Sequence, residues 1–172
     1  MDFLIPIAQV VSITGSGFIA GFGYACSFVS MPVILSAVAP DLQAKQWLAT
    51  YKIGARTGPP VSAVSALSFA FLAYQSTGRK GSYPDSSLDL TEPWALYTAA
   101  AVALISIVPY TLIVMKQTTN NPLTAAAAKP GSLSSAQTKA LIQRWTRQNN
   151  FRQVFGFAGT ALGIMATVMR SR

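Results

Sequence analysis

The chain has 172 residues, of which 51% are hydrophobic and only 10% are charged, and its formal net charge is +8. Soluble domains carry about 25% charged residues, so this composition excludes an ordinary soluble globular protein. The lack of histidine and the single cysteine exclude a histidine-activated nucleophile, an imidazole-ligated metal, an internal disulfide and a CxxC redox pair. Any catalysis is therefore expected to proceed without a protein-bound metal.

The charged residues are clustered and leave four long uncharged runs, at 3–40, 57–78, 93–115 and 153–169. A helix rises about 1.5 Å per residue, so roughly 20 apolar residues cross a hydrocarbon core about 30 Å thick. The rival, a soluble bundle, would need polar stripes that the later runs lack. We expect an all-α, integral membrane four-helix bundle forming a single domain over 1–172, with spans near 4–31, 57–77, 94–115 and 151–169.

The basic residues predict how the spans are oriented. Four spans place both termini and the 78–92 loop on one side of the membrane. On that side the bases and the acids are equal in number. The other side carries nine bases and one acid, namely Lys45, Lys52, Arg56, Lys116, Lys129, Lys139, Arg144, Arg147 and Arg152 against Asp41. Because short loops rich in Lys and Arg stay in the cytoplasm, we expect this side to be cytoplasmic, at the endoplasmic reticulum or a related endomembrane.

Prolines mark the ends of the first two spans. The first span is expected to end near Pro32, and Pro59 and Pro60 fit the first turn of the second, where a missing N–H costs little. In the loop between these spans, Trp47 and Tyr51 are four residues apart and would share one helical face at the membrane surface. The 78–92 loop is expected to be irregular or a short hairpin.

The polar stretch after the third span divides into two parts. Residues 120–131 are predicted to be a linker with little to pack. Ser134 or Ser135 can cap a short amphipathic helix before the fourth span, which runs through Asn150 and either ends there or continues into the span. One face of this helix carries Leu141, Trp145, Asn149 and Arg152, at spacings of four, four and three.

Small residues predict where helices approach closely. Gly17 with Gly21 and Gly159 with Gly163 form GxxxG pairs, which allow backbones to pack tightly inside a bilayer.

Polar and aromatic residues gather at the basic ends of the spans. They are Trp47, Tyr51, Lys52, Arg56, Tyr110, Asn120, Asn121, Trp145, Asn149, Asn150 and Arg152. Each one alone has an ordinary explanation, because aromatic residues form interfacial belts, bases snorkel and asparagines cap helices. An interfacial belt does not require Trp, Asn and Arg to share one helical face. We therefore expect a functional site here.

At this cluster the sequence resembles the anthrone oxygenase-like family of small four-span fungal membrane proteins. The matching pieces are Gln46-Trp47 with Tyr51 and Gly54, Pro109-Tyr110-Thr111 with Met115, Thr119-Asn120-Asn121-Pro122-Leu123, and Trp145 with Asn149 and Arg152. Their order and spacing, together with the span pattern, cover nearly the whole chain. The resemblance implies oxidation of an anthrone, a reduced tricyclic polyketide, to an anthraquinone in secondary metabolism, with O₂ as co-substrate and no cofactor.

This chemistry suggests roles for the clustered residues. The doubly benzylic CH₂ of an anthrone is acidic and its anion reacts with O₂ directly, so the enzyme must form and hold that anion. We expect Arg152 and Arg56 to act on the anion as catalytic donors. The expected substrate-binding residues are Trp145, Trp47 and Tyr110 as stacking surfaces, and Asn149, Asn120 and Asn121 as partners of the phenols.

The proton acceptor stays open among Tyr51, Asp41, Tyr110, Lys52 and a phenolate of the substrate, with Tyr51 and Asp41 favoured. Two rival functions also stay open. The same scaffold could catalyse a cyclisation, an isomerisation or another oxidation of a polyketide, or the chain could be a non-enzymatic membrane helper of a pathway. The expected partners are an aromatic polyketide and the lipid bilayer, with a homo-oligomer left open and no nucleic acid.

Overall fold

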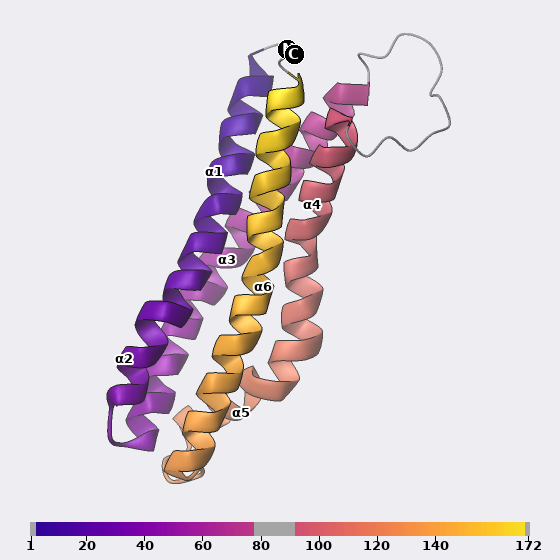
Figure 1. Cartoon of the computed structure of the whole chain (residues 1–172). Helices are drawn as coiled ribbons and strands as arrows, with labels where there is room; N and C mark the ends of the chain where they lie inside the picture. The colour runs from indigo at the N-terminus through magenta and orange to yellow at the C-terminus, as the bar shows by residue number, and fades with distance from the viewer. Residues whose placement is uncertain (1–2, 78–91, 171–172) are drawn as a thin grey trace. The chain divides into compact units, whose positions relative to one another are not determined.

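A computed structural model describes residues 3–77 and 92–170, and all the regular structure in these ranges is helical. The helices form four rods along the chain (Figure 1). The rods are α1 (Leu4–Ala25), η1 (Cys26–Ser30) and α2 (Met31–Ser36); α3 (Pro40–Thr77); α4 (Pro93–Tyr110), η2 (Thr111–Asn120) and α5 (Asn121–Ala128); and α6 (Ser135–Arg170). The all-α prediction is confirmed, while the predicted 78–92 loop lies, apart from Glu92, outside the described residues.

Within the described ranges, three rods are long and apolar enough to cross a membrane: Leu4–Ser36, Pro93–Ala128 and Ser135–Arg170. They indicate an integral membrane protein. The rod α3 is not among them, because its first half is polar and its second half is interrupted by Ser62, Ser65 and Ser68. A membrane crossing at 57–77 therefore stays a prediction.

The short amphipathic helix predicted before the fourth span is wrong, and the alternative of a helix that continues is correct, because α6 is one helix from Ser135 to Arg170. No proline interrupts it, and its first glycine is Gly156. Its start is fixed by a capping box, in which the Ser134 amide donates to Gln137 Oε1 (2.9 Å) and the Gln137 amide donates to Ser134 Oγ (3.3 Å). The predicted cap at Ser134 is therefore correct, although the helix it starts is longer.

Two further boundaries differ from the prediction. Pro59 and Pro60 lie inside α3 rather than in its first turn, and the carbonyls they leave unpaired belong to the exposed residues Ala55 and Arg56, where polar surroundings can hydrogen-bond them. The first rod likewise continues beyond Pro32 to Ser36.

The predicted linker at 120–131 is largely a helix, α5, and is packed. Pro122 occupies its first turn, which proline tolerates, and the following alanines are the strongest helix formers. Ala126 and Ala127 pack against Ala44, with Leu48 and Leu133 beside them. Burial of these small side chains orders a segment that looks featureless in the sequence.

The described chain divides into two compact units. Unit 1 consists of Met1–Ile19, Pro60–Ser106 and Phe155–Arg172, and unit 2 of Ala20–Pro59 and Ile107–Val154. In unit 1, the Tyr97 side chain is fully buried, its hydroxyl accepts a hydrogen bond from Gln9 Nε2 (3.1 Å), and it pairs with Thr167 Oγ1 (2.9 Å). The hydroxyls of Thr160 and Ser16 pair at 2.9 Å. Such bonds join helices inside a bilayer.

Gly163 allows a close helix contact in unit 1. A Cβ built there would overlap the ring of Phe69, and one at Gly159 would lie 3.3 Å from the Ala100 carbonyl oxygen. At the other predicted pair, a Cβ on Gly17 would make an ordinary contact with the Thr160 methyl group (3.8 Å), and one on Gly21 would meet nothing within 4 Å beyond its own stretch of helix. The close approach expected of GxxxG thus applies to the second pair.

Gly163→Ala is expected to lower the free energy of unfolding by about 1–3 kcal/mol, because the added methyl forces the Phe69 ring to move. Unfolding in detergent, followed by circular dichroism, measures this change. Gly21→Ala adds the same methyl group to open space and is the matched control, expected to be neutral or stabilising. Equal losses in both variants would mean that the contact with Phe69 does not matter.

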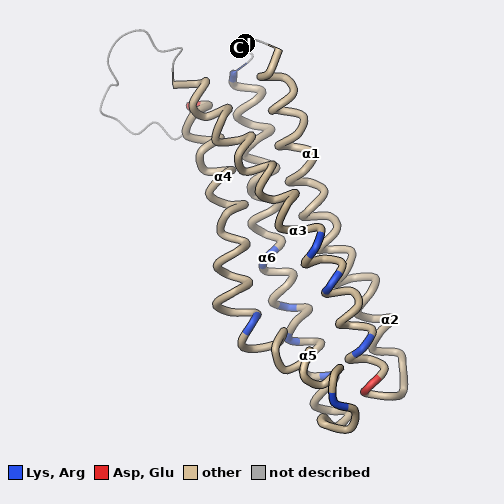
Figure 2. The backbone as a smooth tube through the Cα atoms, turned by 180° about the vertical axis from the view of Figure 1, so that it is seen from behind, with Lys and Arg blue, Asp and Glu red and all other residues tan. Residues whose placement is uncertain are grey.

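All the bases assigned to the predicted cytoplasmic side lie in unit 2. Figure 2 shows the Lys and Arg positions in blue and the acids in red along the backbone. Unit 2 holds the nine bases and Asp41, whereas the described part of unit 1 holds Arg170 and Glu92. The positive charge inferred from the sequence thus belongs to a single compact unit.

Candidate active site

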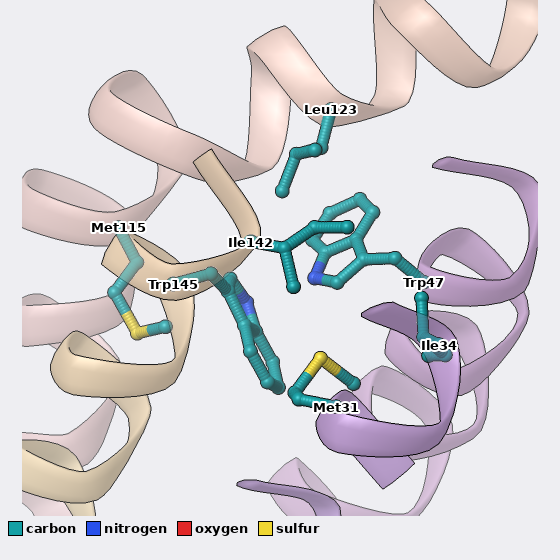
Figure 3. Packing of buried hydrophobic residues seen from close by; sticks show 7 residues of the cluster. All are labelled: Met31, Ile34, Trp47, Met115, Leu123, Ile142 and Trp145. Carbon is teal, nitrogen blue, oxygen red and sulfur yellow. The ribbon is translucent and has the colours of Figure 1, made fainter. Parts of the chain in front are cut away.

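Unit 2 contains a buried cluster centred on two tryptophans. It consists of Met31, Ile34, Trp47, Met115, Leu123, Ile142 and Trp145 (Figure 3). The indole of Trp47 stacks on Tyr51 with ring centroids 5.1 Å apart and 7° between the planes. Trp145 meets Trp47 edge to face, with centroids 6.0 Å apart. The aromatic residues that the sequence places far apart therefore form one group.

Asn149 is the centre of a buried polar network on the same helix as Trp145. Its amide Nδ2 donates to the Gly23 carbonyl (2.7 Å) and to Ser27 Oγ (2.8 Å). Its Oδ1 accepts from Arg152 Nη2 (2.6 Å) and from Gln153 Nε2 (3.3 Å). With no exposed surface, this side chain has its hydrogen-bonding capacity used by the protein itself.

Arg152 is half-buried and held by neutral groups. Besides Asn149, its guanidinium donates through Nη1 to Thr111 Oγ1 (3.2 Å). It lies close enough to Cys26, Tyr51 and Tyr110 to interact with them electrostatically. Its Nε has no hydrogen-bond partner in the described chain. Since neutral partners do not cancel its charge, Arg152 brings an uncompensated positive charge into the cluster.

Asp41 is the single acid of unit 2, and it is used elsewhere. Its Oδ1 accepts a hydrogen bond from the Gly131 amide (2.9 Å), which ties the start of α3 to the turn after α5. Gly131 has φ of 75°, a left-handed conformation that glycine adopts most easily. The geometry gives Asp41 a structural task.

Two π-helical segments shape the walls of the site. The Met31 amide donates to the Cys26 carbonyl and the Asn121 amide to the Lys116 carbonyl, each five residues back. Pro32 follows Met31, and Pro122 follows Asn121. Each proline therefore stands in the first turn of the next α-helix, where its lack of an N–H costs little. Ser27 lies in η1 and Thr111 begins η2. Wide turns of this kind are rare and occur frequently at functional sites.

A groove of about 330 Å³ opens beside the cluster. It is lined by Ser27, Met31, Pro32, Leu35, Gln143, Thr146 and Arg147. Ser27 links the groove to the Asn149 network, and Met31 links it to the tryptophan cluster. The volume is at the lower end of the range for small-molecule sites, which run from about 300 to 1,000 Å³.

The structure brings together most of the predicted site residues. Trp47, Tyr51, Tyr110 and Trp145 belong to or pack against the cluster, and Asn149 and Arg152 form the network beside it. Asn120 is buried at the end of η2, and its Oδ1 has no partner among the described residues. Arg56 and Asn121, by contrast, are exposed on α3 and α5.

Several residues of the site carry no signal in the sequence. Ser27, Thr111 and Gln153 are polar residues in apolar runs, and spacing alone does not connect them with Asn149. Gly23 gives no such signal either, although the structure explains why it is a glycine: a Cβ there would overlap the Gln153 amide. Within the described ranges, no three His, Cys, Asp or Glu side chains come together to hold a metal. The metal-free reaction stays a prediction.

These features define a helical integral membrane protein with a buried site of aromatic rings and one uncompensated arginine. The chain belongs to the anthrone oxygenase family, whose sequence profile matches residues 47–162. The family resemblance inferred from the short sequence pieces is thereby confirmed. No solved structure gives a significant match.

Curated relatives agree with this assignment over most of their length. The anthrone oxygenase encC of Aspergillus fumigatus is 28% identical, covering 94% of this chain and 93% of the relative. Anthrone oxygenase tpcL of the same fungus is 27% identical, covering 93% and 92%. The noranthrone monooxygenase of Aspergillus flavus is 26% identical, covering 91% of this chain and 70% of the relative.

Proposed function

We propose that this protein oxidises an anthrone to the corresponding anthraquinone with O₂, as a tailoring step in polyketide biosynthesis and without a protein-bound metal. Family membership and the names of the relatives support the reaction class. The observation that carries the site assignment is Arg152, a half-buried cation held by an amide and a hydroxyl beside two tryptophans. A planar anion is the ligand that such surroundings favour.

The proposed reaction balances without another oxidant. A base removes a proton from the CH₂ opposite the ketone, and the electron pair spreads onto the ketone oxygen as an anthranolate. O₂ adds at the deprotonated carbon to give a hydroperoxide. Loss of water from that carbon leaves the second carbonyl of the quinone. One oxygen atom enters the product and the other leaves in water, so the four electrons reduce one O₂.

Each residue of the site has a different role in this proposed reaction. Arg152 stabilises the anthranolate by charge, an effect that is strong where water is excluded. The aromatic side chains of Trp145, Trp47 and Tyr110 surround the flat tricycle, which enters from the groove beside Met31. Asn149 orients Arg152 and does not contact the substrate itself, because its own hydrogen bonds are already made.

Tyr51 is the proposed proton acceptor. It stacks on Trp47 and lies within electrostatic reach of Arg152, whereas Asp41 is bonded to Gly131. We expect Tyr51→Phe to lower kcat by about 10²–10⁴-fold, the usual contribution of a general base. Asp41→Asn keeps an oxygen for the Gly131 amide and is expected to retain activity. Loss of activity in Asp41→Asn with a wild-type rate in Tyr51→Phe would reverse this assignment.

The function is tested directly with protein purified in detergent after treatment with a chelator. Emodin anthrone is added under air and under nitrogen, and quinone formation is followed by absorbance. Under air we expect quinone to form much faster than in the protein-free control, with ¹⁸O from ¹⁸O₂ in one carbonyl. A rate equal to the protein-free control would refute the oxygenase function. Recovery of activity only after added metal would refute the metal-free reaction.

We also propose that α3 provides a fourth crossing over 57–77 and that the basic unit 2 faces the cytoplasm. The excess of bases in unit 2 supports this orientation. Single cysteines at Lys45, which is exposed, and at Glu92, which is partly exposed, flank the proposed crossing in α3. In a Cys26→Ser background, an impermeant maleimide would label them from opposite sides. Labelling of both from the same side would exclude the fourth crossing.

A further inference from the structure

Both tryptophans of the cluster carry a buried hydrogen-bond donor without an acceptor. The side chain of Trp47 has no exposed surface and that of Trp145 is 4% exposed. Neither Nε1 has a hydrogen-bond partner in the part of the chain that the structure describes. A buried indole N–H is normally paired, because leaving it unpaired costs free energy. Two such donors in one cluster call for an explanation.

The two indole nitrogens lie on facing sides of their rings (Figure 3). Their rings meet nearly at a right angle, 85° between the planes, with centroids 6.0 Å apart. Figure 3 shows each indole nitrogen on the side of its ring that faces the other tryptophan. In an edge-to-face pair, one N–H can at most point at the π face of its neighbour, a weak contact. The second N–H gains nothing from that arrangement.

The surrounding side chains do not offer a good acceptor. The other members of the cluster are Met31, Ile34, Met115, Leu123 and Ile142, which are aliphatic or carry a thioether. A thioether sulfur is a weak acceptor. The single carboxylate of unit 2, on Asp41, is bonded to Gly131. No group of the described chain accepts a hydrogen bond from either indole, so a ligand could supply the acceptor.

Met31 separates these donors from the groove. It is 1% exposed and packs in the tryptophan cluster, yet it also lines the 330 Å³ groove. Methionine is unbranched and changes rotamer easily, so it yields to an entering ring more readily than a β-branched residue. Movement of this one side chain would open a path from the groove to the indole N–H groups.

We propose that the indole N–H groups of Trp47 and Trp145 form a donor pair for one oxygen of a planar aromatic ketone. The inference rests on the proposed function, in which that oxygen is the anthrone carbonyl. When the proton leaves the CH₂ group, its electron pair moves onto this oxygen, and both hydrogen bonds strengthen as negative charge develops. The carbonyl forms again when O₂ adds. Arg152 stabilises this anion through its charge, and the indoles stabilise it through directed hydrogen bonds.

Nitrogen-15 NMR of the indole groups tests the pair. The chain has three tryptophans, so selective labelling gives three indole signals, and Trp94 in unit 1 is the internal control. The protein in micelles is titrated with 9,10-anthraquinone and, separately, with anthracene, which has the same ring shape and no oxygen. We expect anthraquinone to move the Trp47 and Trp145 N–H protons downfield by about 1 ppm relative to anthracene, with Trp94 unmoved. Identical shifts with both probes, or no shift, would refute the donor pair.

Activity separates this inference from the function itself. Replacing Trp47 or Trp145 by 3-benzothienylalanine keeps the bicyclic ring and removes the N–H. We expect kcat to fall by about 10²-fold at each site with little change in KM, since the bonds strengthen on the way to the anion. Wild-type kcat in both variants would refute the donor role and leave the oxygenase intact. Anthraquinone-specific shifts in a protein without oxygenase activity would instead refute the function and leave the donor pair.

Discussion

Arg152→Ala is expected to lower kcat for anthrone oxidation by about 10²–10³-fold, the usual cost of removing one group that stabilises an oxyanion. The loss arises because Arg152 is a half-buried cation whose charge its partners, Asn149 and Thr111, do not cancel. In the structure, no other Lys or Arg of unit 2 donates a hydrogen bond to Asn149 or Thr111. Initial rates of quinone formation at saturating substrate under air measure the effect.

Two further variants show whether charge or shape matters at this position. Arg152→Lys keeps a charge but loses the planar fork that reaches Asn149 and Thr111 together, so we expect most activity to be lost here too. Arg144→Ala removes an exposed arginine of the same helix and is expected to keep the wild-type rate. If Arg152→Ala and Arg144→Ala were equally active, Arg152 would be excluded from the site.

Arg56 is tested by the same assay. Its place near aromatic residues in the sequence predicts a catalytic role, and the structure leaves it exposed on α3. The proposal therefore gives Arg152 the task of holding the anion. An Arg56→Ala rate near that of Arg144→Ala would agree with a role for Arg56 in membrane orientation alone.

Asn149→Leu is expected to lower stability and activity together. Leucine makes none of the four hydrogen bonds of Asn149, which join it to the Gly23 carbonyl, Ser27, Arg152 and Gln153. Losing one partner of a buried polar group costs about 1–3 kcal/mol, and bonds inside membranes are often weaker. We expect the free energy of unfolding to fall by about 2–4 kcal/mol, measured by unfolding in detergent.

Asn149→Asp separates the two effects. The carboxylate would pair with Arg152 and cancel the charge of the guanidinium. In the wild-type protein, two neutral side chains accept from this guanidinium. We expect folded protein with less than about one hundredth of the wild-type kcat, in line with the loss of an oxyanion donor. Gln46→Leu, at an exposed amide of α3, is the control for both Asn149 variants. Full activity in Asn149→Asp would mean that the reaction does not need a free positive charge on Arg152.

In the proposed site, the Asn149 network keeps a cation available for the substrate. Arg152 is oriented by Oδ1 of Asn149, and Asn149 is fixed by backbone and hydroxyl groups of the first rod through Gly23 and Ser27. A carboxylate could accept from the arginine, but it would cancel the arginine's charge and could not donate to the Gly23 carbonyl. Using an amide for this task leaves the charge for the anthranolate.

The sequence by itself determined the class of protein. Long uncharged runs predict helices that cross a membrane, because a bilayer accepts only backbone whose hydrogen bonds are made internally. It also determined the family, through short pieces around Trp47, Tyr110 and Trp145 that the profile match confirms. Trp145, Asn149 and Arg152 could be placed on one helical face by spacing alone, since the helical period fixes which residues share a face.

The tertiary structure decided which residues meet. Spacing within one helix could not show that Asn149 bonds to Gly23 and Ser27, because those groups lie more than 120 positions earlier in the chain. It also decided that 121–128 is a packed helix and that α6 is unbroken, since both depend on burial against neighbouring segments. The division between Arg152 and Arg56 belongs to the same class of facts. Both are arginines near aromatic residues in the sequence, and only packing leaves one half-buried among polar partners and the other exposed.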